Sequence, residues 1–317
     1  MKLSLMIQVY NGGDYWRQCW DSVVANIDFF DDIFVSVSNS PQQKNDVARV
    51  RAYDSPKVHL LVHDSRMTAV EHGKKMWKWV ASFEPAGHVF ILCHDDILCR
   101  EGLRELKALD LKKDDAVFGP WHFFSDDGTE RDLIVRQFRR DDGKPLSKEF
   151  FGFLVDQQPY LINVSGIVIP SEIFKYREFP WNLCRYGSRS EYLFMCSLRI
   201  RQVYQPTLPA VKIRRHQNSE GVLASDENNM FDTLLYLNMA FKVYDKLPTR
   251  FFTIQSFLYI IRRKFFTGVL FLILTQYRLW SNGYLRKSDI LKIWYSLISA
   301  GGKKTVSRIA GALGIRR

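Results

Sequence analysis

The chain has 317 residues, 46% of them apolar and 25% charged, which is the composition of a folded protein with one sizeable core or two small domains and excludes intrinsic disorder. Its five cysteines are an odd number without a C-x-x-C pair, so no disulfide framework or zinc site is predicted, and reduced thiols fit the cytosol. Residues 246–317 hold fourteen Lys and Arg against one acid, a net charge of +13, so residues 1–245 carry −2 of the total of +11. Because the net basic charge is confined to this tail, nucleic acid is not expected to be the main ligand.

The first hundred residues predict strands that alternate with helices. Strands are expected at Leu3–Tyr10, Ile33–Val37, Val58–Val62 and His88–Asp96, and helices at Asp14–Asn26, Asn45–Tyr53 and Thr68–Phe83. This order is typical of a doubly wound α/β fold with a parallel sheet. No glycine-rich dinucleotide or P-loop motif follows these strands, which argues against a dinucleotide-dependent oxidoreductase and a P-loop enzyme. The apolar run after Lys2 is too short for a signal peptide, so secretion is not predicted.

Two acids, Asp95 and Asp96, come directly after the apolar residues of the fourth predicted strand. In an open α/β sheet, ligands bind at the carboxyl ends of the strands, and adjacent carboxylates suit Mg²⁺ or Mn²⁺ that holds a diphosphate. The alternative is an ordinary polar turn, because Asp is common in turns.

The second half of the chain predicts a less regular pattern. Strands are expected at Ala116–Phe124, Leu133–Phe138, Asn163–Ile169 and Ala210–Arg214, helices at Lys148–Val155, Ser188–Ile200 and Asp226–Tyr244, and a turn or helix from Pro170. We expect residues 1–225 to form an α/β domain and residues 226–317 to form a basic, helical region.

The tail is rich in aromatic and aliphatic residues, but its longest uncharged run, Phe265–Tyr277, has 13 residues. A helix needs about 20 to span a bilayer, so the tail is not expected to span one. Apolar residues recur at helical spacing among basic residues, Trp and Tyr, which is typical of helices that lie in a membrane interface: Ile254, Phe257, Leu258, Ile261 and Phe265. The alternative is that these helices cap the first domain and that their charges are solvated.

Five segments follow one another over roughly residues 3–220: LMIQVYNGGDYWRQCWDSVVAN, FILCHDDIL, SGIVIPSEIF, GSRSEYLF and RRHQNS. In this order they resemble glycosyltransferase family 2, the inverting enzymes with a GT-A fold. The resemblance implies a Rossmann-like, mostly parallel sheet flanked by helices, and the composition of the tail adds a C-terminal α-helical segment that associates with a membrane. It also implies sugar transfer from a nucleotide sugar, with Mg²⁺ or Mn²⁺ as cofactor.

The resemblance implies a metal site formed by Asp95, Asp96 and His216. Asp95 matches the metal-ligating second Asp of the family's Asp-x-Asp motif, and Cys93 stands where the first would be. We interpret Cys93 as a buried strand residue, because a thiol is a poor ligand for Mg²⁺, with Asp96 and His94 as possible substitutes for the missing carboxylate. His216 matches a family position that can reach the metal or the diphosphate; the alternative is a surface loop histidine.

The donor is expected at a set of residues that end the first, second, fourth and last strands: Val9, Tyr10, Asn11, Asn39, Asp95 and Arg215. Tyr10 would stack on the base, whereas the alternative for Tyr10 and Asn11 is a core tyrosine with turn chemistry. The family carries Asp residues where this chain has Ser38 and Asn39, so UDP-, dTDP- and GDP-sugars all stay open as donors. Arg214, like Arg215, is of a type that faces phosphates.

The resemblance assigns the general base to Glu191, which matches the Asp of the family's Glu-Asp pair, with Ser190 in place of the preceding Glu. The alternative for Glu191 is a helix-terminal acid that is favourable with the helix dipole. Trp181 and Gly166 are expected at the acceptor, and the alternative for Trp181 is a core anchor.

The implied activity is inverting transfer of a sugar to a hydroxyl of a lipid-linked glycan in bacterial cell-surface polysaccharide synthesis, such as that of O-antigen. The protein would be peripheral at the cytoplasmic face of the inner membrane. A first alternative is a non-catalytic GT-A-like subunit that binds a glycan or scaffolds a membrane-associated complex, suggested by the neutral residues that replace acids. A second alternative is a nucleotidyltransferase, which uses a similar sheet and metal carboxylates.

Overall fold

The protein is seen in a computed structural model, which describes residues 1–127, 129–133, 146–147, 164–175, 200–216, 273–283 and 285–300. The seven elements expected in the first hundred residues are confirmed to within a few residues. They are β1 (Leu3–Val9), α1 (Gly13–Ala25), β2 (Ile33–Val37), α2 (Gln43–Arg51), β3 (Val58–Val62), α3 (Ala69–Ser82) and β4 (His88–Cys93).

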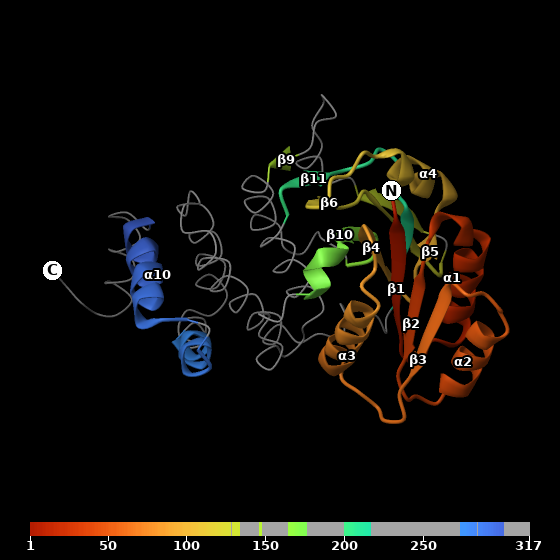
Figure 1. Cartoon of the computed structure of the whole chain (residues 1–317), viewed down its shortest axis with the longest axis horizontal. Helices are drawn as coiled ribbons and strands as arrows, with labels where there is room; N and C mark the ends of the chain where they lie inside the picture. Colours follow the sequence, from red (N-terminus) through yellow and green to blue (C-terminus); the bar gives the residue numbers. More distant parts are fainter. Residues whose placement is uncertain are drawn as a thin grey trace.

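The first four strands form a parallel sheet in the order β3-β2-β1-β4. Connections between parallel strands are right-handed, so α1 and α2 cover one face of the sheet and α3, which returns the chain to β4, covers the other (Figure 1). The direction of the strand order reverses between β1 and β4. The crevice at the carboxyl ends of these two strands is the usual ligand site of an open α/β sheet.

The sheet continues past β4 with strands from the second half of the chain. In the described residues its full order is β3-β2-β1-β4-β10-β6-β11-β9, and β10 (Ile167–Pro170) is antiparallel to β4. The other members are β6 (Asp115–Val117), β11 (Gln202–Tyr204) and β9 (Leu146–Ser147). The sheet is therefore mostly parallel, as expected. Its centre is apolar on both faces, because β1, β2 and most of β4 are buried.

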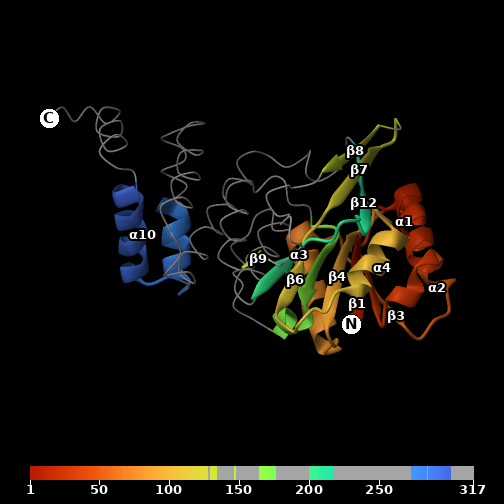
Figure 2. The same cartoon turned by 90° about the horizontal axis from the view of Figure 1, so that it is seen from above.

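A second, smaller sheet lies against the carboxyl end of β4. Its order is β5-β12-β7-β8, with β5 (Ile97–Leu98) directly after the two acids and β12 (Val211–Arg215) parallel to β7 (Trp121–Ser125). β8 (Glu130–Leu133) completes a hairpin with β7. Figure 2 shows this hairpin projecting beside β12 and the start of α1. The short β5 thus carries the chain from the acids straight into the second sheet.

Three expectations for the second half need correction. The single strand expected at Ala116–Phe124 is two strands in different sheets, because the chain turns at Gly119, which has φ 59°. The strand expected from Asn163 begins only at Ile167, after Gly166 with φ 84°. The strand expected from Leu133 begins earlier, since β8 already starts at Glu130.

Several elements confirm or extend the expectations. The strand expected at Ala210–Arg214 is β12, and a 3-10 turn, η4 (Ser171–Lys175), follows Pro170 as predicted. Helix α4 (Arg100–Ala108) and strands β5, β9 and β11 were not predicted. The helices expected at Lys148–Val155 and Asp226–Tyr244, most of the one at Ser188–Ile200, and the domain boundary at 225 lie outside the described residues.

A side chain of α2 holds the turn between β1 and α1. Asn11 and Gly13 both have φ 52°, and the backbone N–H groups of Gly12 and Gly13 donate to the two carboxylate oxygens of buried Asp46 at 3.1 and 3.2 Å. Asp46 satisfies amides at the start of α1, which have no partner within the helix. Asp14, where the predicted helix begins, lies inside the first turn of α1, and no side chain caps the helix at Gly12. The residues that end β1 are thereby held in one geometry.

Two helical segments are described in the tail, residues 273–281 and α10 (Lys287–Ala300). Trp294 Nε1 donates to Gln276 Oε1 at 2.8 Å, which joins the two helices. Within the part of the chain that the structure describes, no helix has both the length and the apolar character that a membrane crossing requires.

Candidate active site

The two acids after β4 have different environments. Asp95 Oδ2 lies 2.9 Å from Nε2 of His216, the residue after β12. Asp96 is 2% exposed, and its Oδ1 accepts a 2.8 Å hydrogen bond from the backbone N–H of Arg214 in β12. Asp96 therefore anchors the loop to the second sheet, while Asp95 forms a pair with an imidazole. That pairing of Asp95 with His216 joins residues 121 apart in the sequence.

The pKa values of the two carboxyl groups move in opposite directions. Burial acts to raise the pKa of Asp95, but the hydrogen bond from His216 and the nearby His94 outweigh it, so the pKa of Asp95 lies below its ordinary value. Burial, and then the charge of Asp95, raise the pKa of Asp96 well above its ordinary value. Of the two, Asp95 is therefore the carboxyl group that ionises more readily.

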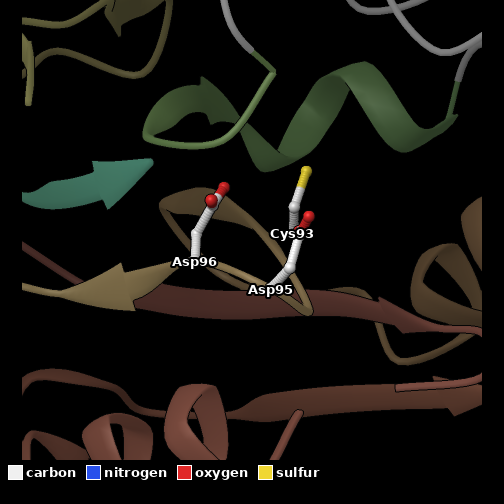
Figure 3. Close-up of side chains that lie close together, drawn as sticks. All are labelled: Cys93, Asp95 and Asp96. Carbon is white, nitrogen blue, oxygen red and sulfur yellow. The ribbon is translucent and has the colours of Figure 1, made fainter. Parts of the chain in front are cut away.

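A third ligand type faces the same space. Cys93 Sγ and one oxygen each of Asp95 and Asp96 lie within 4.8 Å of one another. Figure 3 shows the side chains of Cys93, Asp95 and Asp96 pointing to the same side of the backbone. Cys93 is only half-buried, so our interpretation of it as a buried strand residue is wrong. It ends the strand, and there its side chain emerges from the core.

Arg214 holds this loop from the side of β12. Its side chain is 5% exposed and lies between the rings of Tyr15 and Phe124, with Cζ 4.6 and 4.5 Å from the ring centroids. Its guanidinium donates to Asp126 and to Gln18, both at 2.6 Å, and to the Asp95 carbonyl at 3.2 Å. Arg214 therefore connects α1, the β7–β8 turn and the acidic loop, and each of its three nitrogens donates one hydrogen bond in doing so.

Tyr15 and Asp126 complete this network. The Tyr15 hydroxyl donates to Asp126 at 2.5 Å, and the Tyr15 ring lies 4.8 Å from the His216 ring, centroid to centroid. His216 is thus held by Asp95 on one side and by an aromatic ring on another. Sequence reasoning missed Tyr15, Gln18 and Asp126. Tyr15 and Asp126 are 111 residues apart, so no local pattern marks them as partners.

The ends of β1 and β2 lie at the same edge of the sheet as β4. Val9 is fully buried and its carbonyl accepts from the Ser38 N–H, so only its backbone lies near the crevice. Tyr10 is half-buried, and Arg66 lies over its ring at 5.7 Å, a residue that sequence reasoning did not select. The Asn39 amide donates to the Asp64 carbonyl at 2.6 Å, which closes the loop after β2 onto the loop after β3.

The remaining predicted site residues are placed as follows. Gly166 is buried where β10 begins, and a Cβ there would lie 2.5 Å from Val211 Cγ1, so its backbone and not a side chain faces the neighbouring strands. Arg215 is exposed and lies over the Phe123 ring at 4.3 Å. Glu191 and Trp181 lie outside the described residues, so their roles stay predictions.

A histidine pair lies between β2, β3 and α3, near the carboxyl edge of the sheet. Buried Ser36 Oγ is 2.8 Å from His72 Nε2 and 2.9 Å from His63 Nε2. Burial, with His63 and His94 nearby, lowers the pKa of His72 from 6.5 to about 3. The neutral imidazole is therefore part of the folded state at neutral pH.

Acid should destabilise the protein through His72. The pKa of His72 is lower in the folded state than in the unfolded state. The contribution of His72 to the free energy of unfolding is therefore complete above about pH 6.5 and decreases as the pH falls toward about 3. At about pH 5 the loss is about 2 kcal/mol. Urea unfolding at pH 7 and pH 5 should show this decrease in the free energy of unfolding. In the His72→Gln variant the decrease between the two pH values should be smaller by about 2 kcal/mol. An unchanged pH dependence in the variant would contradict the assignment.

Comparison with solved structures places this fold among known ones. The chain superposes on S. aureus TarS residues 1–349 with a TM-score of 0.55 and 12% identity, over 96% of this chain and 82% of that one. The complex of the same protein with UDP-GlcNAc matches with a TM-score of 0.56 and 11% identity, over 95% of this chain and 79% of that one.

A further match is GalNAc-T7 with UDP, GalNAc and Mn²⁺, with a TM-score of 0.51 and 11% identity, over 81% of this chain and 51% of that one. No protein-family model matches the sequence, and no curated protein matches it. At these identities the likeness concerns the fold: a mixed α/β structure with a mostly parallel central sheet of the kind that these structures share.

Proposed function

We propose that this protein is an inverting glycosyltransferase that moves a sugar from a nucleotide-diphosphate donor to a hydroxyl of a glycan acceptor. The observation that carries the proposal is the Asp95–His216 pair, 2.9 Å apart, at the crevice between β1 and β4. The fold that surrounds this crevice is shared with structures that hold UDP-GlcNAc and UDP with GalNAc and Mn²⁺. The family 2 resemblance of the sequence points to the same chemistry.

The donor set fits a divalent cation. Asp95 offers a carboxylate whose pKa lies below its ordinary value, and His216 offers an imidazole in direct contact with it. Asp96 is the weaker candidate, because one of its oxygens already accepts from the Arg214 N–H. A bound Mg²⁺ or Mn²⁺ would neutralise the charge that develops on the departing diphosphate. Asp95 and His216 would hold that cation, and Arg214 would keep both in place.

The nucleotide would bind along the ends of β1 and β2. Tyr10 would stack on the base, with Asn11 and Asn39 as hydrogen-bonding neighbours and Val9 contributing backbone only. Arg66, over the Tyr10 ring, places a cation at the same edge. Arg215 is exposed one residue before His216 and would face a phosphate. This arrangement supports binding of a nucleoside diphosphate, and UDP, dTDP and GDP are the nucleotides to compare.

A panel of nucleoside diphosphates tests the proposal. The full chain should unfold at a higher temperature with one of UDP, dTDP or GDP plus Mn²⁺, and less so with the nucleotide alone, because a ligand that binds the native state stabilises it. Release of the same nucleoside diphosphate from its sugar conjugate should follow. No stabilisation by any of the three, with or without the cation, would overturn the proposal, and pyrophosphate release would indicate a nucleotidyltransferase.

The general base is proposed to be Glu191, with Trp181 and Gly166 at the acceptor, on the strength of the family resemblance. A base must lie within hydrogen-bond reach of the attacking hydroxyl, and direct displacement then inverts the anomeric centre. Glu191→Gln should reduce transfer by about 100-fold or more while donor binding in the thermal-shift assay is unchanged. Near-normal turnover in this variant would remove Glu191 from the role.

A second candidate, a non-catalytic glycan-binding or scaffold subunit, is favoured by the neutral residues that stand where the family carries acids: Cys93, Ser38, Asn39 and Ser190. Such a subunit would bind a glycan without cleaving any nucleotide sugar. Detectable transfer or hydrolysis of a nucleotide sugar by the purified protein would exclude it.

We also propose that the tail docks on an anionic membrane, at the cytoplasmic face of the inner membrane, and presents a lipid-linked glycan of a cell-surface polysaccharide to the site. The support is the net +13 of residues 246–317 and the exposed apolar side chains on its described helices: Tyr277 (59%), Trp280 (40%) and Leu291 (70%). Lys287 lies over the Trp280 ring at 5.5 Å, so cation and aromatic ring share one surface.

Vesicle sedimentation measures this docking. The full chain should sediment with vesicles that contain phosphatidylglycerol and far less with pure phosphatidylcholine, and the difference should shrink at high salt. Replacing Tyr277 and Trp280 by Ser should weaken the binding to anionic vesicles about tenfold. Equal sedimentation with both vesicle types would contradict the proposal.

A further inference from the structure

The backbone of Cys93 is fixed on three sides, which determines where its thiol lies. Its N–H donates to Ser165 Oγ at 3.1 Å, and its carbonyl accepts from the Asp96 N–H at 3.2 Å and from Cys19 Sγ at 3.6 Å. It is also the last residue of β4 in register with β1, opposite Gln8. The side chain therefore leaves the sheet where the acidic loop begins, on the same side as Asp95 and Asp96 (Figure 3).

The separations of the donor atoms suit one cation. The Cys93 sulfur and the oxygens of Asp95 and Asp96 lie within 4.8 Å of one another, and the Asp95 carboxylate is 2.9 Å from the His216 imidazole nitrogen. Sulfur, nitrogen and oxygen ligands bind zinc at about 2.0–2.3 Å, so donors on two sides of one ion lie about 4 Å apart. The Cys93 sulfur and an Asp95 oxygen can therefore share one ion, and the His216 imidazole lies beside Asp95.

The chemistry of these donors differs from that of a site made of carboxylates alone. Mg²⁺ prefers oxygen ligands in an octahedral shell, whereas thiolate and imidazole favour Zn²⁺ and the ions that resemble it, such as Cd²⁺ and Co²⁺. Mn²⁺ stands at the weak end of the affinity order for such sites. A thiol in this position therefore changes which cation is bound best.

We propose that Cys93 and Asp95, with His216 beside Asp95, form a site with sulfur and oxygen donors that binds thiophilic divalent cations, of the Zn²⁺ class, more tightly than it binds Mg²⁺ or Mn²⁺. Cys93 binds as the thiolate, and its proton passes to solvent. Asp96 stays outside the ligand set, because it anchors the loop to β12. The inference refines the cation site of the proposed function, and Cys93 is its metal-selecting residue.

Cobalt titration provides a readout that does not depend on activity. Reduced, metal-free full chain should develop a sulfur-to-cobalt charge-transfer band when Co²⁺ is added, because a bound thiolate gives such a band and oxygen or nitrogen ligands do not. Cys93→Ser should lose the band. Cys99→Ser is the matched control and should keep it, since Cys99 is a half-buried cysteine six residues along whose sulfur contacts the Ile97 carbonyl at 4.0 Å. A band that is absent in wild type, or that survives in Cys93→Ser, would overturn the proposal.

A selectivity measurement completes the test. Cys93→Asp should weaken Cd²⁺ binding and strengthen Mn²⁺ binding, so that the ratio of the two dissociation constants changes by about tenfold or more, equivalent to about 1.4 kcal/mol. An unchanged ratio in this folded variant would refute the selecting role of Cys93. Nucleoside diphosphate binding is read separately by thermal shift. Nucleotide binding without a cobalt band would refute this inference alone. A cobalt band without binding of any nucleoside diphosphate would refute the proposed transferase.

Discussion

Asp95→Asn should abolish cation-dependent donor binding while the protein stays folded. The amide keeps the size of the side chain but loses its charge, so no carboxylate remains beside His216 to bind a cation. We expect the Mn²⁺-dependent rise in unfolding temperature with nucleotide to disappear and sugar transfer to fall by about 100-fold or more. Without ligands, the free energy of unfolding should change by less than about 1 kcal/mol, because the substitution also removes the repulsion with Asp96.

Asp96→Asn is the matched comparison, because the same change one residue later reaches a different environment. Asp96 is buried and accepts a hydrogen bond from the Arg214 N–H. The Asp96→Asn variant should therefore have a lower free energy of unfolding, while its affinity for a cation changes little. Urea unfolding and Mn²⁺ titration of both variants separate the two roles. If Asp95→Asn were strongly destabilised while its cation affinity stayed normal, Asp95 would be a structural residue like its neighbour.

Arg214→Met should be the most destabilising of these substitutions. It removes three hydrogen bonds and the cation held between two aromatic rings from a side chain that is 5% exposed. Breaking a buried charged network costs about 3–5 kcal/mol, and we expect about 3, because Asp126 is 47% exposed and can turn to water. The midpoint of urea unfolding measures this loss.

Arg215→Met supplies the control from the next position. Arg215 is exposed and contacts the Phe123 ring, so its replacement should cost about 0.5 kcal/mol. Arg214→Lys keeps the charge but not the planar fork, and should recover only part of the stability. Losses of equal size at 214 and 215 would show that the network around Arg214 contributes little.

Local periodicity was sufficient to predict the first half of the fold. The strands β1 to β4 are short apolar runs, and each is followed by a polar turn, so their limits could be given to within a few residues. Helix α4 escaped notice because only Gly102, Leu103 and Leu106 of its nine residues are buried, which leaves little apolar pattern. The break at Gly119 lies inside an apolar run that reads as one strand.

The site was predictable only in part, for a similar reason. Asp95 stands out because a carboxylate follows a buried strand, and His216 because its segment resembles a family motif. Tyr15 and Asp126 carry no such signal, because a tyrosine in a helix and an aspartate in a turn are ordinary until the fold joins them. The direction of the Cys93 side chain was likewise set by tertiary contacts, through the hydrogen bond from its N–H to Ser165.

The order in which the chain supplies these parts has a consequence for biosynthesis. A nascent chain that has left the ribosome only through β4 contains all four parallel strands at the start of the sheet, but His216 and the Arg214 anchor of the acidic loop are still to be translated. The Asp95–His216 pair therefore cannot form before about two thirds of the polypeptide has emerged. Translation products that end before His216 would contain these four strands without the pair.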